Sequence, residues 1–494
     1  MTVDEAEVEK TVVRQAVKND DVWTAGRALR LVVAVVALTI CSLRIWIQAG
    51  DAFPALRDIF APVVDIQTVT SALVFALVAL LAWKAPHRIR PIAFTVVSAV
   101  GVIVGSVLWI GGMSTHEAWL IVLGVCLVDS LGVWSVLLTG LTMCALGGRR
   151  DLVVAAVLGE VLGAALRIVV PSLSLPVAVL TISALTLALV GVSAIFGVPF
   201  LMDALSRRSI ASLATTNPES FLTPRHRLVV LVAFFEFMHG VVLAEGTTIF
   251  TLATRASSWL LILVGGAWVL ARRRQGTEDA LLNMAAILMV LGFAIRPLSP
   301  GEAIASEAIA IAGASFSWML LWSSMAAVGM GYPAAALWTF GLCYTMEALA
   351  MGAGSLAVEV AGALPLASDH VFNVMNALVI AAFLAYLLTG MRGFSFSEVF
   401  RCVRPVVELE TMTERRGATI ARNCPLVAAR CGLTEREAEV LALLARGCSG
   451  PEIQERLVIS QNTAKTHVRH IYRKLGVHSQ RELIALVEGA GDRP

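Results

Sequence analysis

The sequence has few charged residues for its length. Of its 494 residues, 15% are Asp, Glu, Lys or Arg and 57% are hydrophobic, whereas soluble proteins average about 25% charged and 45–50% apolar residues. This scarcity of charge excludes an ordinary soluble protein. Because the apolar residues form near-continuous runs from about 29 to 392 and then stop, the sequence predicts one polytopic membrane domain followed by a soluble C-terminal part.

Several motifs are also missing. The eight cysteines form neither a CxxC motif nor a Cys/His metal-binding spacing, so we expect no metal site and interpret them as small unpaired residues. A phosphate-binding G-x-x-x-x-G-K-[ST] loop and the segments of a histidine kinase do not occur, and we expect no enzyme, no catalytic residue and no cofactor. Residues 1–28 lack the apolar region of a cleavable signal peptide. No receiver domain precedes the C-terminal part, so aspartyl phosphorylation has no evident place in its control.

Twelve stretches are long and apolar enough to cross a membrane. A bilayer core of about 30 Å needs about 20 apolar residues in a helix, because lipid offers the backbone no hydrogen-bonding partner. The predicted spans are 29–49, 67–84, 91–112, 117–146, 152–171, 175–201, 227–251, 257–271, 279–298, 303–329, 334–360 and 368–391. The eighth is short and the fourth is long enough to be read as two, so the count is least certain at these two places.

The positions of Lys and Arg indicate the orientation, since these residues concentrate in short cytoplasmic loops. With the N-terminus inside, the inside segments hold Lys10, Arg14, Lys18, Arg27, Arg30, Lys84, Arg88, Arg90, Arg149, Arg150, Arg207, Arg208, Arg225, Arg227, Arg272, Arg273 and Arg274. The outside segments offer Arg57, with Arg255 and Arg296 at borderline positions. We therefore expect a multi-pass cell-membrane protein, in contact with the lipid bilayer, whose two termini are both cytoplasmic.

The polar segment 203–226 divides the predicted spans into six and six. This layout, with a basic cytoplasmic central loop, resembles the major facilitator superfamily, whose halves are related by a pseudo-two-fold axis along the membrane normal. The resemblance covers roughly three quarters of the chain. The loop between the second and third spans reads WKAPHRIR and lacks that superfamily's usual Gly-Arg-Lys signature. Its absence argues against working transport more than against a related fold.

Residues 433–488 read LTEREAEVLALLARGCSGPEIQERLVISQNTAKTHVRHIYRKLGVHSQRELIALVE and predict four short helices. Thr434 and Glu437 form a capping box that opens the first helix. Pro451 fits the first turn of a second helix, and Ser460 is the next N-cap. Two helices joined by so short a turn form a helix-turn-helix unit.

The third predicted helix, about 461–475, has two different faces. The apolar face contains Ala464, Val468, Ile471 and Leu475, and the basic face contains Asn462, Lys465, Thr466, Arg469 and Arg473. A basic helix face with hydrogen-bonding side chains suits a DNA major groove about 12 Å wide, where cations neutralise phosphates. A merely solvated face is the alternative, but the caps and the spacing favour DNA. Acidic residues nearly balance the basic ones in this region, so we expect modest, salt-dependent non-specific affinity.

The motif LTEREAEVLALLARG followed by S-x-x-T-x-K-T-H-V-x-x-I-x-x-K-L-G-V resembles the LuxR-type helix-turn-helix of bacterial transcription regulators. The resemblance covers about 60 residues and implies double-stranded DNA as a partner. The resemblance implies that Lys465, Thr466 and Arg469 face the groove and that Thr463, His467, His470 and Arg473 lie nearer the DNA backbone. Asn462, on the basic face described above, completes the predicted DNA-binding residues. The fourth helix, from about Ser479 to Val487, resembles the family's dimer contact and implies a homodimer on a roughly two-fold DNA site.

The sequence departs from the family's pattern at three places. Ala464 replaces the commoner Val, Gln480-Arg481 transposes the usual Arg of the fourth helix, and Gly450-Pro451 is unusual in the second helix. The expected domains are a cytoplasmic N-terminal segment (1–28), a membrane domain (29–392), a linker with a helix around 412–430 (393–431) and a LuxR-type DNA-binding domain (432–494). The fold class is therefore all-α, with a twelve-helix (6+6) membrane domain and a small four-helix C-terminal domain.

Ionisable side chains inside membrane spans are costly and are functional candidates by default. Those away from the predicted helix ends are Arg44, Asp129, Glu160, Arg167, Glu236, His239, Glu245, Glu307 and Glu347. We predict a ligand pocket that contains Asp129, Trp134, Glu160, Arg167, Glu236, His239 and Glu347, and further aromatic rings for an apolar ligand are offered by Phe234, Phe235, Trp318, Trp322 and Trp338. The alternative is that these charged residues pair with one another as structural elements.

Three functions fit this organisation. The first is a membrane-bound one-component transcriptional regulator, in which the membrane domain senses an unknown small molecule and controls sequence-specific DNA binding by the C-terminal domain. The second is a transporter of a small molecule that doubles as a regulator. The third, a purely structural anchor, leaves twelve spans unexplained because one span would tether the domain. We favour the first.

Overall fold

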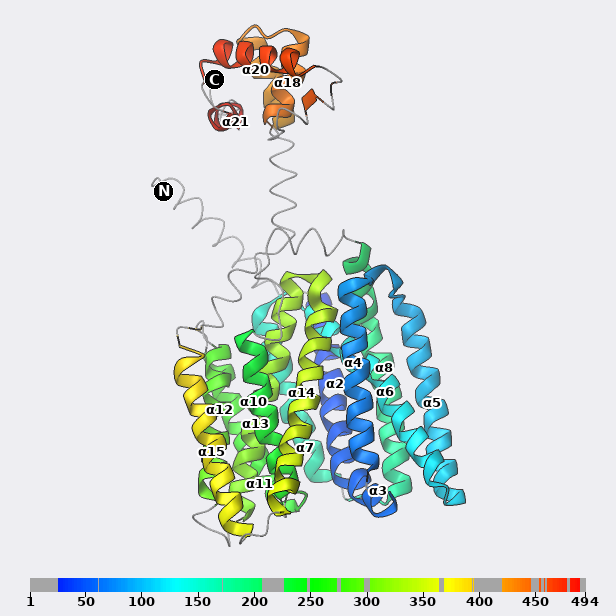
Figure 1. Ribbon diagram of the computed structural model, residues 1–494. Coiled ribbons are helices and arrows are strands. Elements are labelled where there is room, and N and C mark those ends of the chain that lie inside the picture. The colour runs from blue at the N-terminus through cyan, green and yellow to red at the C-terminus, as the bar shows by residue number, and fades with distance from the viewer. Residues whose placement is uncertain are drawn as a thin grey trace. The chain divides into compact units, whose positions relative to one another are not determined.

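The computed structural model is helical, with no strand among the residues that it describes (Figure 1). These residues are 25–60, 62–170, 172–206, 226–246, 249–272, 277–296, 303–363, 368–392, 394, 420–445, 453–454, 457, 460–477 and 480–488. The chain divides into two compact units, Met1–Val403 and Arg404–Pro494. The predicted all-α fold class is confirmed.

The first unit contains twelve helices that are long and apolar enough to cross a membrane. The first six are α2 (Ala25–Ile47), α4 (Val63–Lys84), α5 (Pro91–Thr115), α6 (Ala118–Cys144), α7 (Arg149–Val169) and α8 (Leu175–Ser206). The second six are α10 (Arg227–Glu245), α11 (Leu252–Ala271), α12 (Thr277–Ile295), α13 (Ala303–Gly331), α14 (Pro333–Gly362) and α15 (Ser368–Thr389). The six-plus-six prediction is thereby confirmed, and the central segment 207–225 between the halves lies outside the described residues.

Four spans differ from the prediction by more than four residues at one end. Of these, α8 ends at Ser206 rather than at 201, and α10 ends at Glu245 rather than at 251. The first span is longer, because α2 continues through a π-helical turn, η1 (Gln48–Ala52), into α3 (Phe53–Ile59). The eighth, α11, begins at Leu252 rather than at 257, because Thr251 caps it by accepting a hydrogen bond from the Thr254 N–H at 3.3 Å. The fourth span, α6, is one continuous helix where the sequence also allowed two.

The two halves repeat one packing pattern. In each half the first helix packs on the fifth, the third on the fourth, and the second on the fourth. These pairs are α2–α7, α5–α6 and α4–α6 in the first half, and α10–α14, α12–α13 and α11–α13 in the second. Across the halves the pairing is reciprocal, since the second helix of each half contacts the fifth helix of the other, α4 on α14 and α11 on α7. Reciprocal contacts of this kind are what a two-fold relation between repeats produces.

Small residues bring some of these helices close together. A β-carbon at Gly240 on α10 would collide with the Met351 carbonyl on α14, and one at Gly354 would collide with the Phe237 carbonyl. Such close backbone approach is typical of membrane helices, where association depends on packing rather than on the hydrophobic effect. The large apolar side chains that remain exposed on the outer helices, such as Val107 and Leu388, face the position that lipid would occupy.

The second unit is a small helical domain with its own hydrophobic core. Its helices are residues 420–430, α18 (Glu435–Ala445), α20 (Gln461–Leu475) and α21 (Gln480–Glu488). The predicted second helix of this domain, with Gly450 and Pro451, lies largely outside the described residues, as do residues 395–419 of the predicted linker. Each described helix contributes to one buried cluster that includes Val427, Leu441, Ile471 and Leu483.

Candidate functional site

The first helix of the C-terminal domain opens with the predicted capping box. The Thr434 N–H donates to Glu437 Oε2 at 2.8 Å, and the Glu437 N–H donates to Thr434 Oγ1 at 3.3 Å. Both N-terminal donors of α18 therefore have partners, as this motif requires. The helix then buries Val440, Leu441 and Leu444 in the domain core.

The second capped helix, α20, carries the candidate DNA-binding surface. Ser460 caps its start by accepting from the Thr463 N–H at 3.2 Å. Its end is set by Gly476, whose φ of 67° lies in the left-handed region that glycine adopts without strain. Ala464 and Ile471 are buried against the core, so the opposite face of α20 is directed outward.

The eight predicted DNA-binding residues all lie on α20, and six of them are exposed. Exposed are Asn462, Thr463, Lys465, Thr466, Arg469 and Arg473, and half-buried are His467 and His470. Within the part of the domain that the structure describes, Lys465, Arg469 and Arg473 take part in no ion pair, so their charges are directed to solvent. This arrangement presents three cations at a spacing of one helical turn beside hydroxyl and amide groups, which suits phosphate and base-edge contacts.

His470 lies close to a carboxylate of the neighbouring helix. Its Nδ1 atom lies 3.8 Å from Glu437 Oε1 on α18, and Lys474 Nζ lies 2.7 Å from Glu437 Oε2. Lys474 also donates to the Gly432 carbonyl at 2.9 Å. Glu437 therefore fixes α20 to α18, a role that the sequence did not reveal because Lys474 is 37 positions away. The hydrogen bond from Lys474 is the largest of the effects that lower the pKa of Glu437 to about 2.

Glu437→Gln is expected to destabilise residues 404–494 by about 2 kcal/mol at pH 7, since it removes a charged hydrogen-bond acceptor and half of the capping box. A carboxyl group whose folded pKa is lowered stabilises the fold above its unfolded pKa and loses that contribution as the pH falls toward the folded value. The difference between wild type and variant should therefore shrink between pH 5 and pH 2, as measured by thermal unfolding.

Glu439→Gln is the matched control, because Glu439 lies on the same helix but pairs with Arg436 at an exposed position. Exposed pairs contribute less than about 1 kcal/mol. An equal loss in the two variants, or a Glu437→Gln difference that does not change with pH, would contradict the assigned role of Glu437.

An additional helix joins this domain from the N-terminal side. Residues 420–430, which the sequence analysis placed at the end of the linker, bury Ile420, Cys424 and Val427 in the domain core. Asn423 is fully buried, and its Nδ2 donates to the Val487 carbonyl of α21 at 2.9 Å. This helix therefore supports α21, the predicted dimer contact.

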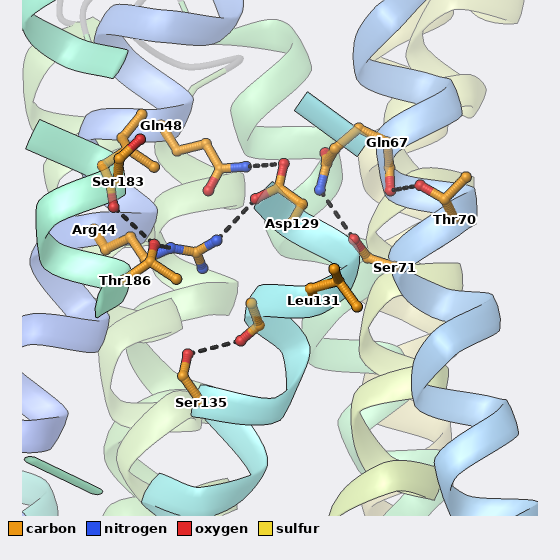
Figure 2. Close-up of polar contacts among 12 residues, drawn as sticks. Arg44, Gln48, Gln67, Thr70, Ser71, Asp129, Leu131, Ser135, Ser183 and Thr186 are labelled. Carbon is orange, nitrogen blue, oxygen red and sulfur yellow. Dashed lines mark hydrogen bonds and ion pairs between the residues drawn. The ribbon is translucent and has the colours of Figure 1, made fainter. Parts of the chain in front are cut away.

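The predicted pocket residue Asp129 is paired inside the N-terminal half. Figure 2 shows Arg44 and Gln48 converging on Asp129, with Arg44 Nη2 2.8 Å from Asp129 Oδ1 and Gln48 Nε2 2.9 Å from Oδ2. Arg44 Nε donates to Thr186 at 2.7 Å. All four side chains are buried, so the charges neutralise each other while tying α2, α6 and α8 together.

A second network joins the two halves. Glu160 on α7 accepts hydrogen bonds from Ser42 at 2.7 Å, from Arg167 at 2.7 Å and from Ser315 on α13 at 2.7 Å. Arg167 Nη2 also donates to Ser42 Oγ. The predicted residues Glu160 and Arg167 thus form a direct ion pair. Ser315, which no motif or spacing singles out, links them to the C-terminal half.

Arg255 adds to this contact between the halves. Its Nη1 atom, on α11, donates to the carbonyls of Arg167 and Val170 at 2.9 and 3.0 Å. Trp46 lies against Phe250 with ring centroids 5.0 Å apart, and the Arg167 guanidinium lies 5.2 Å from the Trp46 ring. Charged and aromatic side chains therefore fasten the two halves at one end of the bundle.

Glu236, His239 and Glu347 form a third group of predicted pocket residues. His239 Nδ1 lies 3.2 Å from Glu236 Oε2. Glu347 on α14 is close enough to Glu236 for the two carboxylates to interact electrostatically. The remaining predicted residue, Trp134, lies elsewhere, since its Nε1–H donates to Thr95 at 2.9 Å and its ring packs on Phe94. Among the seven predicted residues, Glu160 thus pairs with Arg167, Glu236 with His239, and Asp129 with Arg44, whereas Trp134 contacts Thr95 and Phe94.

Two small cavities occur in the C-terminal half. One lies between α10 and α13 and is lined by Leu228, Leu231, Val232, Phe235, Glu236, Ser317, Leu320, Leu321 and Ser324. The other is lined by Val242, Glu245, Gly292, Phe293, Arg296, Ser306, Glu307 and Ala310. Each has a volume of about 10 Å³, which is room for about one water molecule.

Comparison with known proteins identifies the C-terminal domain. Residues 432–487 match the family described as bacterial regulatory proteins, luxR family. The HTH-type transcriptional regulator MalT of Vibrio campbellii is 36% identical over 66 residues, which are 13% of this chain and 7% of MalT. The oxygen regulatory protein NreC of Staphylococcus aureus is 44% identical over 52 residues, which are 10% of this chain and 24% of NreC. The chain thus spans less than a quarter of the length of these relatives.

The membrane unit has solved structural neighbours. The Escherichia coli fucose:proton symporter FucP covers 73% of this chain with a TM-score of 0.46 and 11% identity, and 98% of FucP is covered. The nucleoside transporter NupG covers 73% of this chain with a TM-score of 0.37 and 12% identity, and 99% of NupG is covered. No enzyme family is indicated by these comparisons. Residues 432–487 are a LuxR-type helix-turn-helix DNA-binding domain, carried on the same chain as twelve helices that are able to span a membrane.

Proposed function

We propose that this protein is a membrane-bound one-component transcriptional regulator. The C-terminal unit binds double-stranded DNA in a sequence-specific manner, and the membrane unit senses a small molecule that controls this binding. The observation that carries the proposal is the exposed cationic face of α20 in a LuxR-type domain whose chain also holds a twelve-helix unit with buried charged clusters. Both termini lie in the cytoplasm, since the Lys and Arg residues of the loops favour that side and since DNA is reached only there.

The DNA-bound form is a homodimer. Leu483 and Val487 of α21 are buried in their own domain, whereas Ile484 is only half-buried. Ile484 is therefore available to a second copy, as the predicted dimer contact requires. The residues proposed to contact DNA are Asn462, Thr463, Lys465, Thr466, His467, Arg469, His470 and Arg473.

Control by a small molecule requires two states of the membrane unit with different affinities for it, because a ligand that binds both states equally shifts nothing. The contacts of α4 with α14 and of α11 with α7 form the boundary between the halves, and we propose that one half rocks against the other there. The network of Glu160, Arg167 and Ser315 lies on this boundary. A ligand that favours separation of the halves would break it.

A reporter gene tests the proposal. A DNA duplex selected from a random pool by residues 404–494 is placed upstream of the reporter, and cells that express the full chain are exposed to a library of small molecules. We expect at least one compound to change expression about tenfold with the full chain and to have no effect with residues 404–494 alone. If residues 404–494 alone respond equally, the membrane unit is not the sensor. A C-terminal topology reporter that is active outside the cell would also contradict the proposal.

The second candidate function is a transporter that doubles as a regulator. The two-fold pattern of helix contacts, which suits alternating access, favours it. Uptake of the active compound into proteoliposomes separates the two functions. Uptake by the full chain above that of empty liposomes supports transport, whereas regulation without uptake supports the sensor.

A further inference from the structure

Glu236 and Glu347 differ from three other acidic side chains inside the membrane unit, those of Asp129, Glu160 and Glu245. Asp129 pairs with Arg44, Glu160 with Arg167 and Glu245 with Arg296. In the described part of this unit, by contrast, neither Glu236 nor Glu347 has an arginine or lysine partner. Glu236 contacts only the ionisable ring of His239, and the buried Oε2 atom of Glu347 has no hydrogen-bond partner among the described residues. These two carboxyl groups therefore lie side by side without a cationic Arg or Lys partner among the described residues.

Other polar groups beside these carboxylates also lack partners. The Tyr344 hydroxyl, the Trp322 Nε1–H and the Ser324 hydroxyl are buried and make no hydrogen bond with a described residue. Tyr344 interacts electrostatically with both carboxylates, and Ser324 lines the cavity that Glu236 also lines. Buried polar groups nearly always have partners, so several without one at the same place indicate a molecule that would supply them.

Aromatic rings surround the same groups. The Trp322 ring lies 5.6 Å from the Tyr344 ring and 6.0 Å from the Phe340 ring, between centroids. Phe75, from the N-terminal half, stacks on Tyr344 at 5.0 Å. Ring faces attract cations, and carboxylates repel anions. A neutral ligand would leave both carboxylates without compensation, so the chemistry of the site favours a positively charged molecule with an apolar body.

We propose that Glu236 and Glu347, with Trp322, Tyr344 and Ser324, bind a small organic cation. Its ammonium group lies between the two carboxylates, and its apolar body lies against the aromatic rings. This inference rests on the proposed sensor function and gives the chemical class of the ligand. The cavity that Glu236 lines has room for about one water molecule, so the cation requires a second state in which α10, α13 and α14 are further apart.

Binding of three probes of similar size and different charge tests the proposal. The full-length protein, purified in detergent at pH 7, is titrated with phenethylamine, 2-phenylethanol and phenylacetate, and its thermal unfolding is followed. We expect the cation alone to raise the Tm. In Glu347→Gln, and independently in Glu236→Gln, binding of phenethylamine should weaken at least about tenfold, as for loss of one partner of a buried charge pair.

The Tm of each variant without added ligand is a second measurement, because a structural role and a binding role predict opposite changes in it. Because the buried Oε2 atom of Glu347 has no partner among the described residues, Glu347→Gln removes no ion pair and should leave the Tm unchanged or raise it. A lower Tm without ligand would indicate a structural role and overturn the proposal. Equal shifts with 2-phenylethanol or phenylacetate, no shift with phenethylamine, or full retention of the shift in both variants would also overturn it. The regulator function fails separately, if the full chain does not regulate the reporter with any compound.

Discussion

Lys465→Ala is expected to lower the affinity of residues 404–494 for their selected DNA duplex about tenfold or more. Lys465 lies on the exposed face of α20, one turn before Arg469 and two before Arg473, and none of the three is paired with a described residue. Loss of a base-edge contact costs about 1–3 kcal/mol of discrimination, and loss of a phosphate contact reduces the slope of log affinity against log salt concentration by about 0.9. Fluorescence anisotropy at several salt concentrations measures both quantities.

The two outcomes separate the roles of Lys465. A lower affinity with an unchanged salt slope and relaxed sequence preference indicates base contact, whereas a lower slope with unchanged preference indicates phosphate contact. Arg436→Ala is the control, because Arg436 is exposed on α18 and pairs with Glu439 at 2.6 Å. If Lys465→Ala and Arg436→Ala bind equally well, α20 does not carry the DNA-binding surface.

Local signals in the sequence were sufficient to predict α18 and α20 of the C-terminal domain. Thr434 and Glu437 make the capping box, Ser460 caps α20, and the apolar residues of that helix face the core. Each of these signals acts over one or two helical turns, where spacing along the chain determines spacing in the structure. The LuxR resemblance and the all-α fold were recognisable for the same reason.

Contacts between distant residues were not predictable in this way. Asp129 was identified as a candidate ligand residue because it is a charge inside a span, but its partner Arg44 is 85 positions away. Ser315 is one of many serines in the spans, and only the three-dimensional structure places it on Glu160. Asn423 lies in a segment that appeared to be linker, and its bond to Val487 closes a loop of 64 positions. Periodicity reports which face of a helix is buried, but not which helix covers it.

The partners of the charged residues, which only the structure shows, determine how the predicted pocket is interpreted. The alternative that charged residues in the spans pair as structural elements describes Asp129 and Glu160, whose arginine partners neutralise them. It does not describe Glu347, whose Oε2 has no partner among the described residues. The sequence identifies the charged residues inside the spans, which are costly to desolvate. The presence or absence of a cation beside each one, which only the structure shows, separates structural ion pairs from the proposed binding site.

Glu160→Ala is expected to destabilise the membrane unit by about 3–5 kcal/mol, the usual effect of leaving a buried charge without its partner. Glu160 is 2% exposed and accepts from Ser42, Arg167 and Ser315, so the substitution leaves the Arg167 guanidinium unneutralised. By comparison, Ser315→Ala removes one interhelical hydrogen bond, which in membranes averages about 0.6 kcal/mol. The free energy of unfolding in mixed detergent micelles gives both values.

The double variant Glu160→Met with Arg167→Met separates loss of the pair from loss of packing. Because two apolar side chains replace two buried charges, its stability should lie within about 2 kcal/mol of wild type and well above that of Glu160→Ala. Arg272→Ala is the control for removal of an arginine, since Arg272 is exposed and lies 4.0 Å from the Trp268 ring, a contact that contributes about 1 kcal/mol or less. If the double variant is as unstable as Glu160→Ala, the ion pair itself stabilises the contact between the halves. A ligand that separates the halves must then overcome the free energy that this pair contributes.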